Sequence, residues 1–214
     1  IKQIADQGTA IIIVEQSVNL ALTIADRAYF MEKGQIRFNG STKDLLNRPD
    51  LLRSVFLSNT SISAVDTSSK PTTTESKTIL EIEDVTRSFG GILAVSSVTF
   101  DVRSNEIIGI MGPNGAGKTT LFDLLSGFVP LQGGSIKLLG QDITMKPPAE
   151  RSKLGLGRSF QDARLFPSLT VAETIAVGLE RFTSARNPIS GALHLPHVSR
   201  SEKEIRKQVN DLIE

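Results

Sequence analysis

Residues 112–120 carry the most constraining feature of the sequence, a glycine-rich stretch that ends in a lysine and two threonines. It fits the phosphate-loop pattern G-x-x-x-x-G-K-[ST] and consists of Gly112, Pro113, Asn114, Gly115, Ala116, Gly117, Lys118, Thr119 and Thr120. The mostly apolar run 106–111 before it is typical of a buried strand. The run 121–125 after it indicates an amphipathic helix that ends near Gly127. A strand, loop and helix in this order predict a nucleotide-binding loop.

Each residue type in this loop suits a phosphate ligand. Glycines let consecutive N–H groups converge on one point, and the helix that follows directs the positive end of its dipole there. We expect Lys118 to reach the terminal phosphates and the Thr119 hydroxyl to ligate Mg²⁺. The backbone of 114–117 and Thr120 complete the expected cradle. A glycine turn that merely joins strand to helix is the alternative, and the lysine–threonine pair argues against it.

Charge and cysteine content narrow the classes of partner. The chain has 24 Lys and Arg against 23 Asp and Glu, so it carries no strong electrostatic signal for nucleic acid or an anionic membrane. It has no cysteine, which excludes disulfides and cysteine–metal sites. No apolar run approaches the roughly 18 residues of a membrane helix. We therefore expect that, if the protein acts at a membrane, it binds there through partner proteins.

Composition divides the chain into three segments. Residues 1–57 contain two expected strands at 9–14 and 27–32, a tight turn at Lys33-Gly34 and a second turn at Asn39-Gly40, followed by a helix that Ser41 or Thr42 starts. Residues 58–77 are rich in Ser and Thr with almost no apolar residue, which predicts a flexible linker. Residues 78–214 hold the phosphate loop.

Further signals organise the third segment. Partial alternation at 79–85 and 98–102 predicts half-exposed antiparallel strands, and a glycine pair at 133–134 predicts a turn into another strand. Capping boxes at Thr170–Glu173 and Ser201–Glu204 each predict a helix start. Because the chain begins with isoleucine and both ends have a helical pattern, we expect it to be a piece of a longer protein.

The third segment resembles an ATPase of the ABC transporter family, from its first strand through GPNGAGKTT to Phe160-Gln161. The runs LFDLLSGF and GLGRSFQDARLFPSLTVAETIAVG look like one ATPase subunit of the branched-chain amino acid importers. In the first segment, TAIIIVEQSVNLALTIADRAYFMEKGQIRFNG looks like the C-terminal end of the companion subunit. The resemblance implies an α/β P-loop NTPase fold with an antiparallel β subdomain. It also implies two incomplete cassettes joined by the linker.

The resemblance assigns roles to residues outside the phosphate loop. Phe89 stacks on adenine, helped by Val95, although a plain core phenylalanine is the alternative. Gln161 ligates Mg²⁺ and senses the γ-phosphate, although an ordinary loop amide is the alternative. Gln16 stands where most cassettes carry the switch histidine. Because an amide cannot bear a positive charge, we hypothesise weaker hydrolysis by cassette one.

The implied function is the ATP-binding component of an importer of branched-chain or related amino acids, with ATP and Mg²⁺ as cofactors. The implied partners are membrane permease subunits, a second ATPase cassette and, indirectly, a substrate-binding protein; the implied location is the cytoplasmic face of the membrane. These residues contain no signature motif and no apolar run followed by Asp-Glu, so we expect binding rather than hydrolysis. Import of amides or urea, lipopolysaccharide export and a nucleotide-binding regulator or scaffold without transport remain alternatives.

The resemblance also predicts how the segments meet. In related ATPases the switch strand and the strand after it lie on either side of the phosphate-loop strand. Residues 9–15 and 28–33 are therefore expected to flank residues 106–111. The long connection between them permits this, because the cost of loop closure grows only logarithmically with length.

Overall fold

The computed structural model describes residues 1–15, 23–47, 77–159, 168–180 and 196–213. The chain forms two compact units, Ile1–Arg158 and Ser159–Glu214. Helices of the first unit are α1 (Lys2–Asp6), α3 (Thr42–Leu46), α5 (Lys118–Ser126) and α6 (Pro148–Lys153). Its strands are β1 (Ile11–Glu15), β2 (Arg27–Glu32), β3 (Gln35–Ser41), β4 (Thr78–Phe89), β5 (Ile92–Arg103), β6 (Ile107–Met111), β7 (Gly133–Leu138) and β8 (Gln141–Asp142). The second unit contains α7 (Val171–Glu180) and α9 (Pro196–Ile213).

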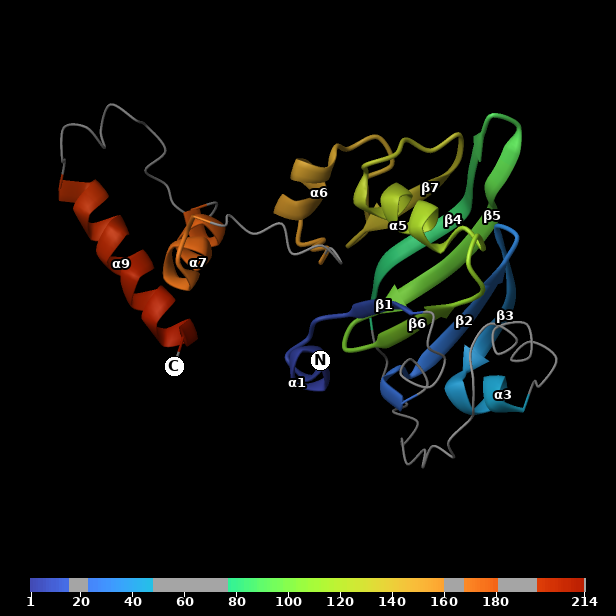
Figure 1. The fold of residues 1–214 in the computed structure, drawn as a ribbon, viewed down its shortest axis with the longest axis horizontal. Helices are drawn as coiled ribbons and strands as arrows, with labels where there is room; N and C mark the ends of the chain where they lie inside the picture. Colours follow the sequence, from blue (N-terminus) through green and yellow to red (C-terminus); the bar gives the residue numbers. More distant parts are fainter. Residues whose placement is uncertain (16–22, 48–76, 160–167, 181–195, 214) are drawn as a thin grey trace. The chain divides into compact units, whose positions relative to one another are not determined.

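A mixed sheet of four strands, in the order β1-β6-β2-β3, joins the first and third segments (Figure 1). Strand β6 pairs in parallel with β1, Ile11 opposite Ile107, and on its other side in parallel with β2, Arg27 opposite Ile108. All five residues of β6 are buried, as expected of a central parallel strand. The predicted flanking of the phosphate-loop strand is therefore confirmed.

The second sheet is antiparallel, in the order β5-β4-β7-β8. Its long strands β4 and β5 form a hairpin, and alternate residues in much of β5 are buried. The mixed sheet and the antiparallel sheet agree with the predicted α/β fold that carries an antiparallel β subdomain.

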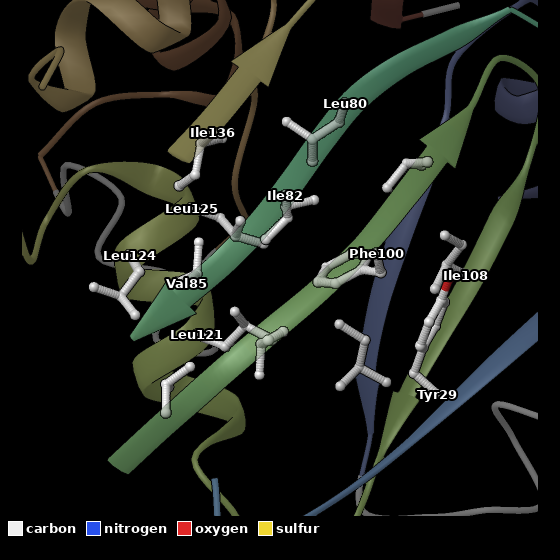
Figure 2. Packing of buried hydrophobic residues seen from close by; sticks show 14 of the residues in the cluster. Tyr29, Leu80, Ile82, Val85, Phe100, Ile108, Leu121, Leu124, Leu125 and Ile136 are labelled. Carbon is white, nitrogen blue, oxygen red and sulfur yellow. The ribbon is translucent and has the colours of Figure 1, made fainter. Parts of the chain in front are cut away.

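The core lies where both sheets meet α5. Its buried side chains come from both segments and include Tyr29, Leu80, Ile82, Val85, Phe100, Ile108, Leu121, Leu124, Leu125 and Ile136 (Figure 2). The first segment thus contributes to the same hydrophobic core as the phosphate-loop segment. No helix among the described residues is long and apolar enough to cross a bilayer.

Several helix ends follow the predicted local chemistry. The Ser41 hydroxyl accepts a hydrogen bond from the Asp44 N–H (3.1 Å) at the start of α3. At the start of α7, the Glu173 N–H donates to the Thr170 hydroxyl (3.3 Å), and the Thr170 N–H donates to the Glu173 carboxylate (2.7 Å). The capping box at Thr170–Glu173 is therefore confirmed. Gly127 ends α5 in the left-handed conformation, as expected.

Three local predictions are wrong. Asn39-Gly40 lies inside β3, because antiparallel pairing with β2 continues to Ser41; the hairpin turn is at Lys33-Gly34, where both φ angles are positive. The glycine pair at 133–134 belongs to β7, since that strand begins at Gly133. Helix α9 begins at Pro196 rather than at Ser201, which is consistent with the tolerance of proline in a first helical turn.

Candidate nucleotide-binding site

The phosphate loop leaves the carboxyl end of β6 and enters α5 at Lys118. Gly117 caps the helix in the left-handed conformation (φ 98°) and has no side chain to accept the first N–H groups. The N-terminal end of α5 therefore directs unpaired N–H groups and the positive end of its dipole toward the loop. This is the strand–loop–helix arrangement that the sequence predicts.

The loop packs closely against two backbone segments. A Cβ atom at Gly112 would collide with the carbonyl oxygen of Met31, at the end of β2. A Cβ atom at Gly117 would collide with the carbonyl oxygen of Ala94, in β5, and lie 3.1 Å from Cε of Met31. Only glycine fits at these two points, so the shape of the loop depends on β2 and β5 as well as on its own residues.

The turn between β2 and β3 is hydrogen-bonded to the loop. The N–H of Gly34 donates to the carbonyl oxygen of Ala116 (2.9 Å), and the carbonyl oxygen of Gly34 accepts from the N–H of Ser96 (2.8 Å). No local sequence pattern indicates this role of Met31, Gly34 and Ala94, because close backbone approach is a tertiary contact. The predicted position of residues 28–33 beside the phosphate-loop strand is the only sequence-based expectation that places Met31 near the loop.

Lys118 curls back over its own loop. Its ammonium donates to the carbonyl oxygens of Gly112 (2.7 Å) and Pro113 (2.9 Å), and the residue is only 7% exposed. Burial lowers the pKa of Lys118, and no carboxylate within the described part of the chain pairs with it. A buried cation that contacts only neutral carbonyls is suited to an anionic ligand, because an anion compensates the charge that burial disfavours.

The other loop residues differ in exposure. Asn114, Gly115 and Thr119 are exposed, Pro113, Gly117 and Thr120 are half-buried, and Gly112 and Ala116 are buried. Thr119 lies in the first turn of α5. No group of three or more His, Asp or Glu side chains among the described residues is arranged to hold a metal. The assignment of Mg²⁺ to Thr119 stays a prediction.

Phe89 and Val95 come from the β4–β5 hairpin but differ in environment. Phe89 is 44% exposed, and the guanidinium of Arg87 lies 4.7 Å from its ring centroid. It is therefore not the plain core phenylalanine of the alternative interpretation. Val95 is fully buried in the core, beside the Ala94 carbonyl on which Gly117 packs. Contact of either residue with a base stays a prediction.

Two predicted site residues, Gln16 and Gln161, lie outside the described residues, as does nearly all of the predicted linker at 58–77. Their assigned roles stay predictions. The structure describes Phe89, Val95 and residues 112–120 and places the loop between β6 and α5.

Comparison with known proteins identifies related sequences. A model of the family described as "ABC transporter" matches residues 95–213. BraF, the high-affinity branched-chain amino acid transport ATP-binding protein of Pseudomonas aeruginosa, is 40% identical over 129 residues, which cover 60% of this chain and 50% of BraF. LivG, the protein of the same description in Escherichia coli, is 36% identical over 129 residues with the same coverage. The chain therefore spans about half the length of these relatives.

A solved structure is also similar. A nucleotide-free ATP-binding cassette from an ABC transporter is 29% identical, with a TM-score of 0.48, and the match covers 61% of this chain and 51% of that cassette.

Proposed function

Because this chain belongs to the ABC transporter family, we propose that it is part of the ATP-binding component of a transporter that imports branched-chain or related amino acids. The relatives BraF and LivG, named for branched-chain amino acid transport, support the substrate class. The observation that carries the nucleotide site is Lys118, a buried ammonium held over a glycine loop by two neutral carbonyls.

In this proposal each residue of the loop has a defined task. The N–H groups of 114–117 and of the first turn of α5 bind the phosphate oxygens, and Lys118 exchanges its carbonyl partners for the terminal phosphates. The Thr119 hydroxyl and Gln161 hold Mg²⁺, which supplies charge neutralisation when bound. Phe89 stacks on the base, and Thr120 completes the cradle.

The proposed organisation is that of a tandem subunit. Residues 1–57 are the end of one cassette, residues 58–77 a linker and residues 78–214 the start of the next. Gln16 occupies the switch position of cassette one. These residues bind nucleotide with little hydrolysis, because the signature and the Asp-Glu pair are not among them. The proposed partners are permease subunits, a second cassette and, through them, a substrate-binding protein, with the chain at the cytoplasmic face of the membrane.

Nucleotide binding by the purified chain tests this function. Titration with a fluorescent ATP analogue in Mg²⁺ should saturate, and Lys118→Ala should weaken affinity at least about tenfold, since a hydrogen bond to a charged group contributes about 1.5–3 kcal/mol. Lys137→Ala is the matched control, because the Nζ of Lys137 lies 3.9 Å from Glu83 at the surface. Equal affinity of the wild-type chain and the Lys118→Ala variant, with circular dichroism showing both folded, would contradict the proposal.

A further inference from the structure

The tip of the β4–β5 hairpin carries Phe89, the aromatic ring that the proposed function assigns to the base (Figure 1). Phe89 is the last residue of β4 and pairs with Ile92, the first residue of β5, so that only Gly90 and Gly91 lie between the strands. Apart from chain neighbours, no described atom lies within 4 Å of a Cβ at either glycine. The position of the ring therefore depends on contacts further back in the hairpin.

The guanidinium of Arg87 contacts the Phe89 ring. Its carbon atom Cζ lies 4.7 Å from the ring centroid, which is within the range of a cation–π interaction. Phe89 nevertheless remains 44% exposed, so part of its surface is accessible to a ligand. The ring is thus restrained by a cation and still available for stacking.

Arg87 is itself anchored on the loop between α5 and β7, residues 127–132. Its Nη1 donates a hydrogen bond to the carbonyl oxygen of Pro130 (3.0 Å), and its Nε is buried. The neighbouring Ser88 donates from its N–H (2.6 Å) and from its hydroxyl (2.9 Å) to Oε1 of Gln132. The N–H of Gln132 donates in return to the carbonyl oxygen of Thr86 (3.1 Å). Arg87 is therefore held between a backbone carbonyl and the aromatic ring.

The loop between α5 and β7 is in turn bonded to the helix. The N–H groups of Phe128 (2.9 Å) and Val129 (3.2 Å) both donate to the carbonyl oxygen of Asp123, near the C-terminal end of α5. The opposite end of α5 follows the phosphate loop. A path of covalent bonds, hydrogen bonds and one cation–π contact therefore connects the phosphate-loop helix to the ring at the hairpin tip.

We propose that Arg87 is a positioning residue for the base, which holds the Phe89 ring at a defined place relative to the phosphate loop. A ligand with an aromatic base at one end and phosphates at the other then meets both binding elements already in place. The assignment rests on the proposed function. Two contacts of Arg87 carry it, one to the ring and one to the loop that is bonded to α5. Such preorganisation raises affinity, because the ligand does not have to restrict the ring when it binds.

Arg87→Met tests this role by comparing two ligands. Affinity for ATP should fall about fivefold, the scale of a partly buried cation–π contact. Affinity for inorganic tripolyphosphate, measured by competition with the fluorescent ATP analogue, should stay unchanged because that ligand has no base. A positive charge that acts directly on the phosphates would instead weaken both ligands equally when removed, and that result would overturn the proposal.

Two further arginine variants control for charge and for folding. Arg37→Met removes the same charge from a side chain that is 53% exposed and lies 3.6 Å from Glu32, so it should leave both affinities unchanged. Arg87→Lys keeps a cation near the ring but lacks the planar guanidinium, so it should lose about twofold in ATP affinity. It also serves if Arg87→Met does not fold. An equal loss of ATP affinity in Arg37→Met and Arg87→Met would assign the effect to net charge and overturn the proposal.

A double-mutant cycle tests whether Arg87 acts through the ring. In a chain that already carries Phe89→Leu, the additional change Arg87→Met should alter ATP affinity by less than about twofold, because the ring that Arg87 holds is gone. A fivefold loss in both backgrounds would mean that Arg87 acts on the ligand independently of Phe89, and the proposal would fail.

Urea unfolding of the same four chains tests the contact without nucleotide. Arg87→Met should lower the folding equilibrium constant about fivefold more in the wild-type background than in the Phe89→Leu background. If the wild-type chain binds neither ATP nor tripolyphosphate, the proposed function fails and the role toward a base fails with it, while unfolding still shows whether Arg87 holds the ring. If the wild-type chain binds ATP but neither cycle shows coupling, the positioning proposal fails and the proposed function stands.

Discussion

The ring of Tyr29 on β2 packs against the ring of Phe100 on β5, with centroids 5.1 Å apart and planes inclined by 47° (Figure 2). The two residues belong to different segments of the chain. Tyr29 is 1% exposed, and the Arg27 guanidinium lies 5.3 Å from the centroid of its ring. This pair therefore reports on whether the two segments share one core.

Titration of Tyr29 tests whether the segments share one core, because Tyr29 is the single tyrosine among the 214 residues. Burial raises the pKa of Tyr29 to about 12, with the nearby charge of Arg27 opposing the shift. Tyrosinate absorbance should therefore rise near pH 12 in the folded chain and near pH 10 in the chain denatured with urea. Titration of the folded chain near pH 10 would show that Tyr29 is not buried.

The raised pKa of Tyr29 also predicts that the stability of the chain depends on pH in the alkaline range. The pKa of Tyr29 is higher in the folded chain than in the unfolded chain. The neutral phenol therefore contributes fully to the free energy of unfolding below about pH 10, and this contribution is lost as pH rises from about 10 to 12. Urea unfolding at a series of pH values should show this loss in the wild-type chain. Tyr29→Phe keeps the ring and has no proton to release, so its free energy of unfolding should fall less over the same range.

A pair of glycine variants tests how closely the phosphate loop is packed. Gly115 and Gly117 both have positive φ angles, 78° and 98°, so alanine at either costs about 1–2 kcal/mol of backbone strain. Nothing lies within 4 Å of a Cβ at Gly115, whereas a Cβ at Gly117 meets the Ala94 carbonyl. Gly117→Ala should therefore lower the free energy of unfolding by about 2 kcal/mol more than Gly115→Ala does. Similar losses in thermal denaturation would mean that the loop does not pack on β5.

The sequence predicted those parts of the fold that depend on local chemistry. The phosphate-loop strand and helix, the end of α5 at Gly127 and the turn position Gly34 all have residues whose backbone preference agrees with the conformation that they adopt. Asn39-Gly40 has an equally strong turn preference, and pairing of β3 with β2 overrides it. Local preference was insufficient there because the strand partner decided the outcome.

Phe89→Ala tests the predicted base contact. Stacking of a base on an aromatic ring contributes about 1–3 kcal/mol, so affinity for ATP should fall about ten- to a hundredfold. Affinity for inorganic tripolyphosphate, measured by competition, should stay unchanged because that ligand has no base. Ile92→Ala is the matched control, since Ile92 pairs with Phe89 across the hairpin and is 74% exposed. An equal loss of affinity for both ligands would mean that Phe89 stabilises the hairpin and does not contact the base.

Substitution of Arg151, which lies outside the nucleotide-binding site, should have a large effect on the free energy of unfolding. It is 2% exposed, and its guanidinium donates to the carbonyl oxygens of Leu124, Leu125, Thr144 and Lys146. Arg151→Ala leaves these buried acceptors without that donor and should lower the free energy of unfolding by about 3 kcal/mol. Lys153→Ala, at an exposed position of the same helix, should change it by less than about 0.5 kcal/mol. Chemical denaturation compares the two, and equal effects would contradict the burial of Arg151.

Arg151 and Arg27 also show why part of the molecule escaped prediction from sequence. Each contacts groups that lie far away in the chain, 26 and 27 residues for the Leu125 and Leu124 carbonyls and 79 residues for Glu106. An isolated arginine in sequence is typical of a solvated surface, and nothing in its immediate neighbours distinguishes a buried one. The resemblance of the first segment predicted where its strands lie but not which side chains join them to β6.

Strand β1 ends the mixed sheet, and among the described residues no strand lies beyond it. Among the described residues, the backbone N–H and C=O groups on its outer edge, along the run Ile11, Ile12, Ile13 and Val14, have no strand partner. Such an isoleucine-rich edge is a template onto which an extended segment of another molecule can add. We expect aggregation of the purified chain to increase with concentration if this edge is open, and a charged substitution in β1 tests that expectation by light scattering.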